Sequence, residues 1–193
     1  YKSISGDPRL SGVDPAIRVE VTVMGGANPS SRRSVTSMVA DHVGTVEGFP
    51  SYDDLEAFEI ETLAAERTLV EKLAMLHDAA KQSLAGDNKR LAGAGRHYYD
   101  VARILASPDV LNELATGSVE SIATDSDAWS DKGGYPFTAR PLTGYATSPA
   151  FTDAGLAEIV RKSFDQAMRW VWSKEKPSLD ECITTVNEHA ALL

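Results

Sequence analysis

The sequence predicts an α+β protein, with a small α/β piece at residues 1–62 followed by a mostly helical bundle at residues 63–193. Two observations lead to this division. Segments in which apolar and polar residues alternate, as is typical of half-buried strands, occur only in the first part. In the second part, apolar residues recur at helical spacing in one segment after another. The change of period falls close to Thr62.

The first part contains two predicted strands. Residues 17–23 alternate Ile and Val with polar residues, and residues 57–63 form a second extended segment. Between them, Asn28-Pro29-Ser30 offers a helix cap, and residues 35–43 are typical of a short amphipathic helix that ends at Gly44.

The helix that follows organises the rest of the chain. Thr68 and Glu71 have the spacing of a capping box. Gly86 is expected to end the helix, and its apolar face is formed by Leu69, Leu73, Leu76, Ala80 and Leu84. Lys72 lies on the shoulder of that face. Its side chain either covers apolar surface with its stem or holds a compact positive charge in place for a phosphate.

Periodicity and turn residues divide the rest of the chain into loops and helices. Residues 86–95 are expected to form a mobile loop, and residues 126–151 a long ordered loop anchored by aromatic residues. Three further helices are predicted: one from Arg96 with Tyr98, Val101, Ala102 and Leu105 inward, one after Ser107-Pro108, and one whose apolar stripe runs from Leu156 to Val171. Ser178 and Glu181 form a second capping box for the last helix.

Composition excludes several classes of protein. The net charge of −9 argues against a nucleic-acid-binding surface over the whole molecule. No long uncharged apolar run is present, so we expect no membrane span. Cys182 is the single cysteine, which favours a reducing, cytoplasmic location.

Several polar residues are candidates for chemistry, each with an ordinary alternative. Arg96 and Asp100 are four residues apart, a spacing that also suits a surface ion pair. His97 lies at the edge of a core face, where packed histidines are common. Glu59 and Glu61 share one face of a strand, as a pair of metal-binding carboxylates would, but also as a solvated strand face would. Glu20 is a weak third candidate for a metal ligand.

Four stretches, taken in order, resemble one family. They are residues 65–73 with Leu76-His77, residues 96–100, the helix carrying Phe164, Met168 and Trp172, and residues 176–181. The chain is similar in these stretches to the nucleotidyltransferase toxins of the AbiEii/AbiGii type, from type IV toxin–antitoxin and abortive-infection systems. The resemblance covers most of the chain from Ile17 onward.

This resemblance implies a fold related to DNA polymerase β-like nucleotidyltransferases, and transfer of a nucleotide from an NTP, with Mg²⁺, to an RNA acceptor, which is tRNA in some members. Lys72 matches the family's motif lysine and would neutralise the triphosphate. Asp100 matches its motif aspartate and would act near the acceptor or hold the lysine. Arg67, Arg96 and His97 would help to bind substrate. A cognate antitoxin is the implied protein partner.

The chain departs from the family pattern before these motifs. A Gly-Gly-Ser/Thr turn and an Asp-x-Asp pair, which supply the nucleotide pocket and the metal ligands, are not found at suitable spacing. Residues 1–62 are therefore expected to be a remnant of the nucleotidyltransferase core. Metal ligands are expected upstream of Tyr1, and the isolated chain is expected to be inactive. The alternative is a non-catalytic helical module that binds a protein partner such as an antitoxin.

Overall fold

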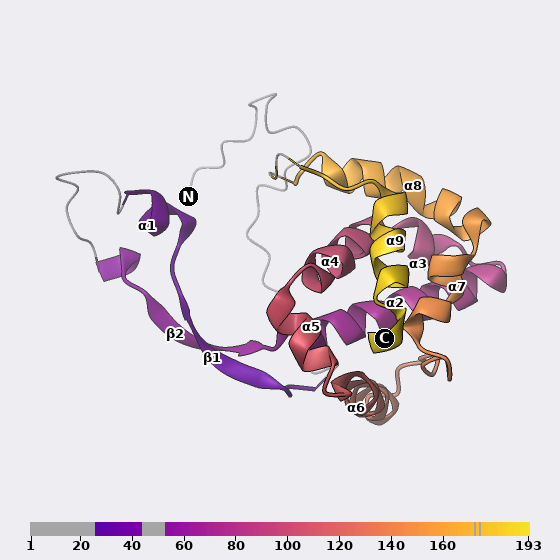
Figure 1. Ribbon diagram of the computed structural model, residues 1–193, viewed down its shortest axis with the longest axis horizontal. Helices are drawn as coiled ribbons and strands as arrows, with labels where there is room; N and C mark the ends of the chain where they lie inside the picture. Colours follow the sequence, from indigo (N-terminus) through magenta and orange to yellow (C-terminus); the bar gives the residue numbers. More distant parts are fainter. Residues whose placement is uncertain (1–25, 44–52, 172, 174) are drawn as a thin grey trace.

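The computed structural model describes residues 26–43, 53–171, 173 and 175–193. The predicted strand at residues 17–23, Glu20 and Trp172 lie outside these residues. A two-stranded sheet comes first and helices follow it (Figure 1). The elements are β1 (Ser30–Val35), α1 (Met38–Val43), the 3₁₀ turn η2 (Asp53–Leu55), β2 (Phe58–Leu63), α2 (Ala65–Leu84), α3 (Lys89–Ala92), α4 (Gly95–Leu105), α5 (Pro108–Leu114), α6 (Ser118–Lys132), η3 (Tyr145–Thr147), α7 (Pro149–Thr152), α8 (Ala154–Met168), α9 (Leu179–Glu188) and η4 (Ala190–Leu192).

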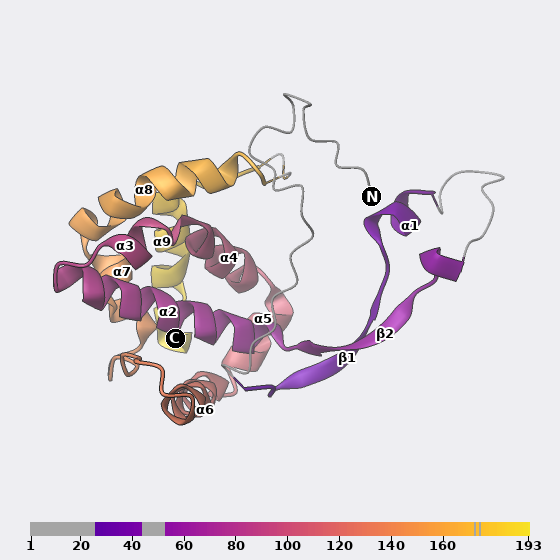
Figure 2. The same ribbon diagram turned by 180° about the vertical axis from the view of Figure 1, so that it is seen from behind.

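The two strands form an antiparallel pair that extends away from helices α2 to α9, with α1 at its outer end (Figures 1 and 2). Its register runs from Ser30 opposite Leu63 to Val35 opposite Phe58. The predicted strand at residues 57–63 is confirmed. The predicted short helix is confirmed as α1, but its start at Val35 was wrong, because residues 30–35 form a strand and α1 begins at Met38. The polar sequence of β1 has no strand periodicity of its own, so its extended form depends on pairing with β2.

Helix α2 begins one turn earlier than the capping box predicted. Thr68 N–H donates to the carbonyl oxygen of Ala64, so Thr68 is already inside the helix. The Glu71 carboxylate accepts a hydrogen bond from Arg67 Nε at 2.7 Å and does not cap the helix. The predicted end is confirmed, since Gly86 follows the helix with a φ of +101°, a conformation that favours glycine.

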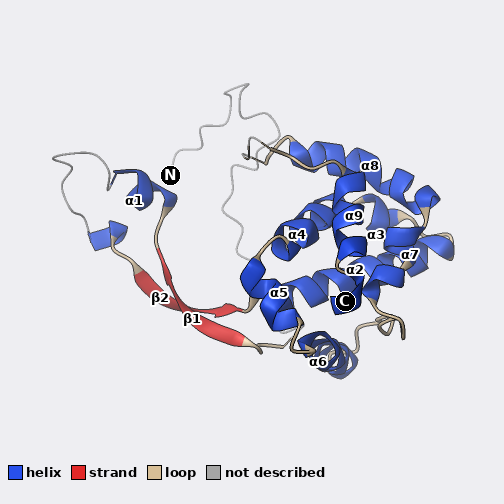
Figure 3. Cartoon of the chain, viewed as in Figure 1, coloured by secondary structure: helices blue, strands red, loops and turns tan. Residues whose placement is uncertain are grey.

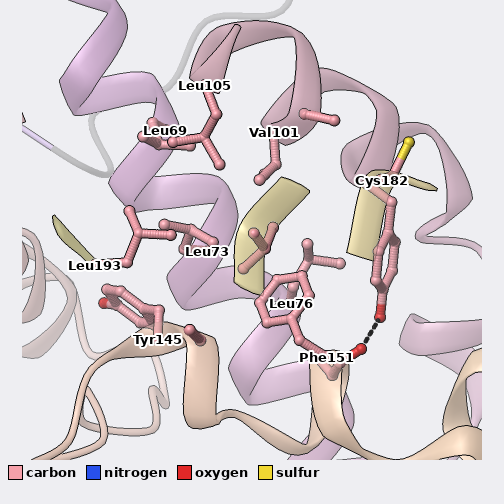
Figure 4. Packing of buried hydrophobic residues seen from close by; sticks show 14 of the residues in the cluster. Leu69, Leu73, Leu76, Val101, Leu105, Tyr145, Phe151, Cys182 and Leu193 are labelled. Atoms are coloured by element: carbon pink, nitrogen blue, oxygen red, sulfur yellow. Dashed lines mark hydrogen bonds between the residues drawn. The ribbon is translucent and has the colours of Figure 1, made fainter. Parts of the chain in front are cut away.

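The helices pack around α2, which contacts α3, α4, α5, α6 and α7 (Figures 1 and 3). The apolar face predicted for this helix is largely confirmed, because Leu69, Leu73, Leu76 and Ala80 are fully buried. Figure 4 shows Leu69 and Leu73 packed beside Val101 and Leu105 of α4. Leu84 was expected in the core, but it is exposed at the end of the helix.

Two predicted loops contain helices instead. Within residues 86–95, the short helix α3 inserts Leu91 into the core, where the side chain is fully buried. Within residues 126–151, the first turns belong to α6, which continues to Lys132. The inward residues of α6 are Val119, Ile122, Ala123 and Ser126. Their helical spacing was missed because aromatic, glycine and proline residues dominate the sequence that follows.

The last two long helices follow the prediction more closely. Helix α8 buries Leu156, Val160 and Phe164, but it ends at Met168, so the exposed Trp170 lies beyond it. The capping box at α9 is confirmed: Ser178 accepts from Glu181 N–H, and the Glu181 carboxylate accepts from Ser178 N–H. In the described part of the chain, no helix combines the length and hydropathy needed to cross a membrane. That residues 1–62 and 63–193 form separate domains stays a prediction.

Candidate active site at the contact of α2 with α4

Lys72 of α2 meets His97 and Asp100 of α4. Lys72 Nζ donates to Asp100 Oδ2 at 2.8 Å and lies 3.3 Å from His97 Nδ1. His97 and Asp100 are three residues apart on α4, so both face the same side of the helix. Two of the residues predicted from the sequence to be catalytic are thus in direct contact, and a third predicted residue completes the cluster.

The cluster is neither fully buried nor freely exposed. The side-chain exposures are 21% for Lys72, 21% for His97 and 28% for Asp100. An ion pair that is partly exposed in this way contributes at most about 1 kcal/mol to stability. The cluster can therefore be altered chemically without unfolding the protein.

His97 is held in its neutral form. Burial lowers the pKa of His97, and the nearby charges of Lys72 and Arg96 lower it further, with Asp100 acting in the opposite direction. A neutral imidazole has one ring nitrogen free to accept a hydrogen bond. His97 Nδ1 is the nitrogen beside Lys72. Because an ammonium group has no acceptor, a hydrogen bond between the two requires the tautomer in which Nδ1 accepts.

Close packing sets the position of α4. At its first residue, Gly95, a Cβ atom would lie 2.2 Å from the backbone nitrogen of Phe164 in α8. Tyr98, one residue after His97, is buried and donates from its hydroxyl to the carbonyl oxygen of Ala150 at 2.9 Å. These contacts fix the helix that presents His97 and Asp100 to Lys72.

Arg67 lies on a different side of α2 and does not join the cluster. Its side chain is fully buried. Its guanidinium donates to Glu71 at 2.7 Å, to Asp125 of α6 at 2.5 Å and to the carbonyl oxygen of Asn28 at 2.6 Å. Arg67 therefore joins α2, α6 and the segment before β1.

Arg96 is exposed at the start of α4. The alternative of a surface ion pair with Asp100 is not found among the described residues, since Asp100 pairs with Lys72. Arg96 instead adds positive charge beside His97, as the lowered pKa of that histidine reflects.

The carboxylates considered as metal ligands are dispersed. Glu59 and Glu61 are exposed on the hairpin, where Glu61 accepts from the Ser30 hydroxyl at 2.7 Å. Asp100 is the one carboxylate of the Lys72 cluster, and it already forms an ion pair with Lys72. Mg²⁺ prefers several oxygen ligands, and the described residues hold no group of three or more residues suited to a metal ion. The cluster alone does not fit Mg²⁺.

His77 and Cys182 are structural residues. His77 is buried and its Nδ1 lies 2.8 Å from the Ser148 hydroxyl. Burial raises the pKa of the Cys182 thiol to about 12, so it stays protonated and unreactive. Asp125 was not predicted as the partner of Arg67, because no helix was predicted over the residues that form the first part of α6. The helical spacing of Val119, Ile122 and Ser126 was the signal that places it on α6.

Comparison with known proteins assigns the class. The family model described as "Nucleotidyl transferase AbiEii toxin, Type IV TA system" matches residues 3–185. The chain belongs to this family of nucleotidyltransferase toxins, as the resemblance predicted. No curated protein and no solved structure matches the chain. Membership of a toxin–antitoxin family implies an antitoxin counterpart.

Proposed function

We propose that the Lys72 cluster is the triphosphate-binding part of a nucleotidyltransferase site that transfers a nucleotide from an NTP to an RNA acceptor, possibly a tRNA, in the cytoplasm. The observation that carries the proposal is the contact of Lys72 with Asp100 at 2.8 Å, made between two helices. It supports the pairing of the two residues that match the family's motif lysine and aspartate.

The chemistry assigned to Lys72 follows from its donors. An ammonium group has three N–H donors and no acceptor. Asp100 and His97 take two of them. The third is the donor that we assign to a phosphate oxygen, because lysine acts on phosphate as a compact point charge.

Asp100 and His97 are proposed as positioning residues. By accepting from Lys72, they restrict a flexible side chain to one direction before substrate arrives, which is how preorganised charge favours phosphoryl transfer. Arg96 supplies a second positive charge near the same point. Arg67 does not contact the cluster. It supports the site indirectly, by holding α2 against α6 and the segment before β1.

Magnesium is proposed as part of the complete site, with its ligands outside the Lys72 cluster, because the described residues of the cluster do not fit it. Magnesium bound elsewhere would stabilise charge on the transferred phosphoryl group. We further propose that the 193-residue chain alone is not a competent transferase.

The test is a transfer assay on the complete gene product with labelled NTPs, RNA and magnesium. We expect Lys72→Met to lower transfer by about 100-fold or more, as the loss of one preorganised charge does. Lys162→Met, at an exposed lysine of α8, is the matched control and is expected to keep wild-type activity. Equal activity of the two variants would refute the role of Lys72.

A further inference from the structure

A cleft lies on the side of α2 that faces α6. It is bounded by α2, by α6 and by residues 135–138, and its volume is about 340 Å³, which is within the range of small-molecule sites. The α2 residues that line it include Glu71 and Asp78, whereas Lys72 faces α4. The cleft is therefore separate from the candidate active site, and nothing in the proposed transfer reaction uses it.

The three carboxylates that line this cleft differ in how many hydrogen-bond donors they have. Asp78 accepts hydrogen bonds from Arg90, Gln82 and Thr138, so both the carboxylate and Arg90 are already engaged. One carboxylate oxygen of Glu71, Oε1, accepts a hydrogen bond from Arg67 Nε. Asp127, in contrast, makes no hydrogen bond or ion pair to any residue that the structure describes, although it is half-buried.

The environment of Asp127 favours a positively charged neighbour. Burial raises the pKa of this carboxyl above its usual value, which reflects the cost of holding a charge with little water around it. A bound cation would compensate that cost. A phosphate or another anion would be repelled by Asp127 and Glu71, because the guanidinium in the cleft, that of Arg90, is already paired with Asp78.

The remaining lining residues are apolar, aromatic or hydroxyl-bearing, which suits a ligand with an apolar chain and N–H donors. Tyr135 and Phe137 are 43% and 41% exposed, large fractions for aromatic side chains, and aromatic rings attract organic cations. Ser126, which is only 8% exposed, also lines the cleft. Its hydroxyl makes no hydrogen bond within residues 26–43, 53–171, 173 and 175–193, so it can donate to or accept from a ligand in the cleft.

We propose that this cleft binds an organic cation, a guanidinium or ammonium group carried on an apolar chain. Asp127 and the remaining oxygen of Glu71 accept its N–H donors, and Tyr135 and Phe137 cover its chain. Such a cationic group on an apolar chain occurs both in free amines and in the basic side chains of a protein partner.

Two probes distinguish these sources in an NMR titration of the amide signals of the 193-residue chain. Agmatine represents a free amine, and N-acetyl-arginine methylamide represents an arginine within a polypeptide. We expect saturable shifts at the cleft residues of α2 and α6. Tighter binding of agmatine assigns the cleft to a free amine, and tighter binding of the arginine amide assigns it to a protein side chain.

Substitutions at Asp127 test whether its charge is responsible. We expect Asp127→Asn to weaken binding of the tighter probe by about tenfold, the value of a charged hydrogen bond, and Asp127→Glu to retain most of the affinity. Asp165→Asn, at an exposed carboxylate of α8, makes the same charge change elsewhere and should bind like wild type. Tyr135→Ala, at a ring outside the helices, should also weaken binding. The proposal fails if neither probe saturates or if Asp127→Asn binds as tightly as Asp165→Asn.

Discussion

Lys72 Nζ lies 2.8 Å from Asp100 Oδ2 and 3.3 Å from His97 Nδ1, across the contact between α2 and α4. The lysine is thereby attached to a second helix whose own position is set by close packing. A side chain with many rotamers is restricted by this contact to one direction.

The first prediction concerns the titration of His97. Because the Lys72 charge lowers the pKa of His97, we expect Lys72→Met to raise it, and Asp100→Asn to lower it. The measurement is an NMR titration of the imidazole signals in the three proteins. A His97 pKa at or above 6.5 in the wild type would contradict the assignment of a neutral acceptor.

The same shift affects stability. The pKa of His97 is lower in the folded protein than the ordinary value of 6.5, so the unfolded chain binds more protons in acid. The free energy of unfolding should therefore decrease as the pH falls below about 6.5, and level off below the folded-state pKa. His77 contributes in the same direction. Urea unfolding between pH 7.5 and pH 5 measures the slope, which should be shallower in Lys72→Met.

A third prediction concerns Arg67. Replacing this fully buried arginine with methionine removes its hydrogen bonds to Glu71, Asp125 and Asn28. We expect Arg67→Met to lower the free energy of unfolding by about 2–3 kcal/mol. Arg96→Met, at an exposed arginine, should change it by less than about 0.5 kcal/mol. Similar urea midpoints for the two variants would show that Arg67 does not join these elements.

A fourth prediction concerns the packing of α4 on α8. A Cβ at Gly95 would lie 2.2 Å from a backbone nitrogen, and one at Gly93 would have no neighbour closer than 3.8 Å. We expect Gly95→Ala to lower the free energy of unfolding by about 3 kcal/mol or more, and Gly93→Ala by less than about 1 kcal/mol. Thermal unfolding of the two variants makes the comparison. If Gly95→Ala were as stable as Gly93→Ala, α4 would not be fixed by this contact.

Periodicity predicted the elements that carry their own apolar pattern, and it failed where structure depends on distant contacts. The buried faces of α2 and α4 follow from spacing, apart from Leu84 at the end of α2, and the cap at Ser178 follows from its capping-box pattern. Strand β1 could not be found in this way, because its polar residues are extended only through pairing with β2. Helix α3 is likewise fixed by the burial of one side chain, Leu91.

The site was predictable only in part. Family resemblance selected Lys72 and Asp100, and it left open whether Asp100 acts near the acceptor or holds the lysine. The contact between the two side chains depends on how α2 packs against α4. Arg67 has the same charge as Lys72 and lies only five residues before it, yet it faces α6. The expected capping box of Thr68 and Glu71 failed for a related reason, because the Glu71 carboxylate binds the buried Arg67.

The central claim is that Asp100 acts through Lys72. A double-mutant cycle on nucleotide transfer by the complete gene product, with Lys72→Met, Asp100→Asn and both together, tests it most directly. We expect the double variant to be no slower than Lys72→Met alone, because Asp100 has nothing to position once the ammonium is gone. If the two losses multiply instead, Asp100 acts independently of Lys72 and the account is wrong.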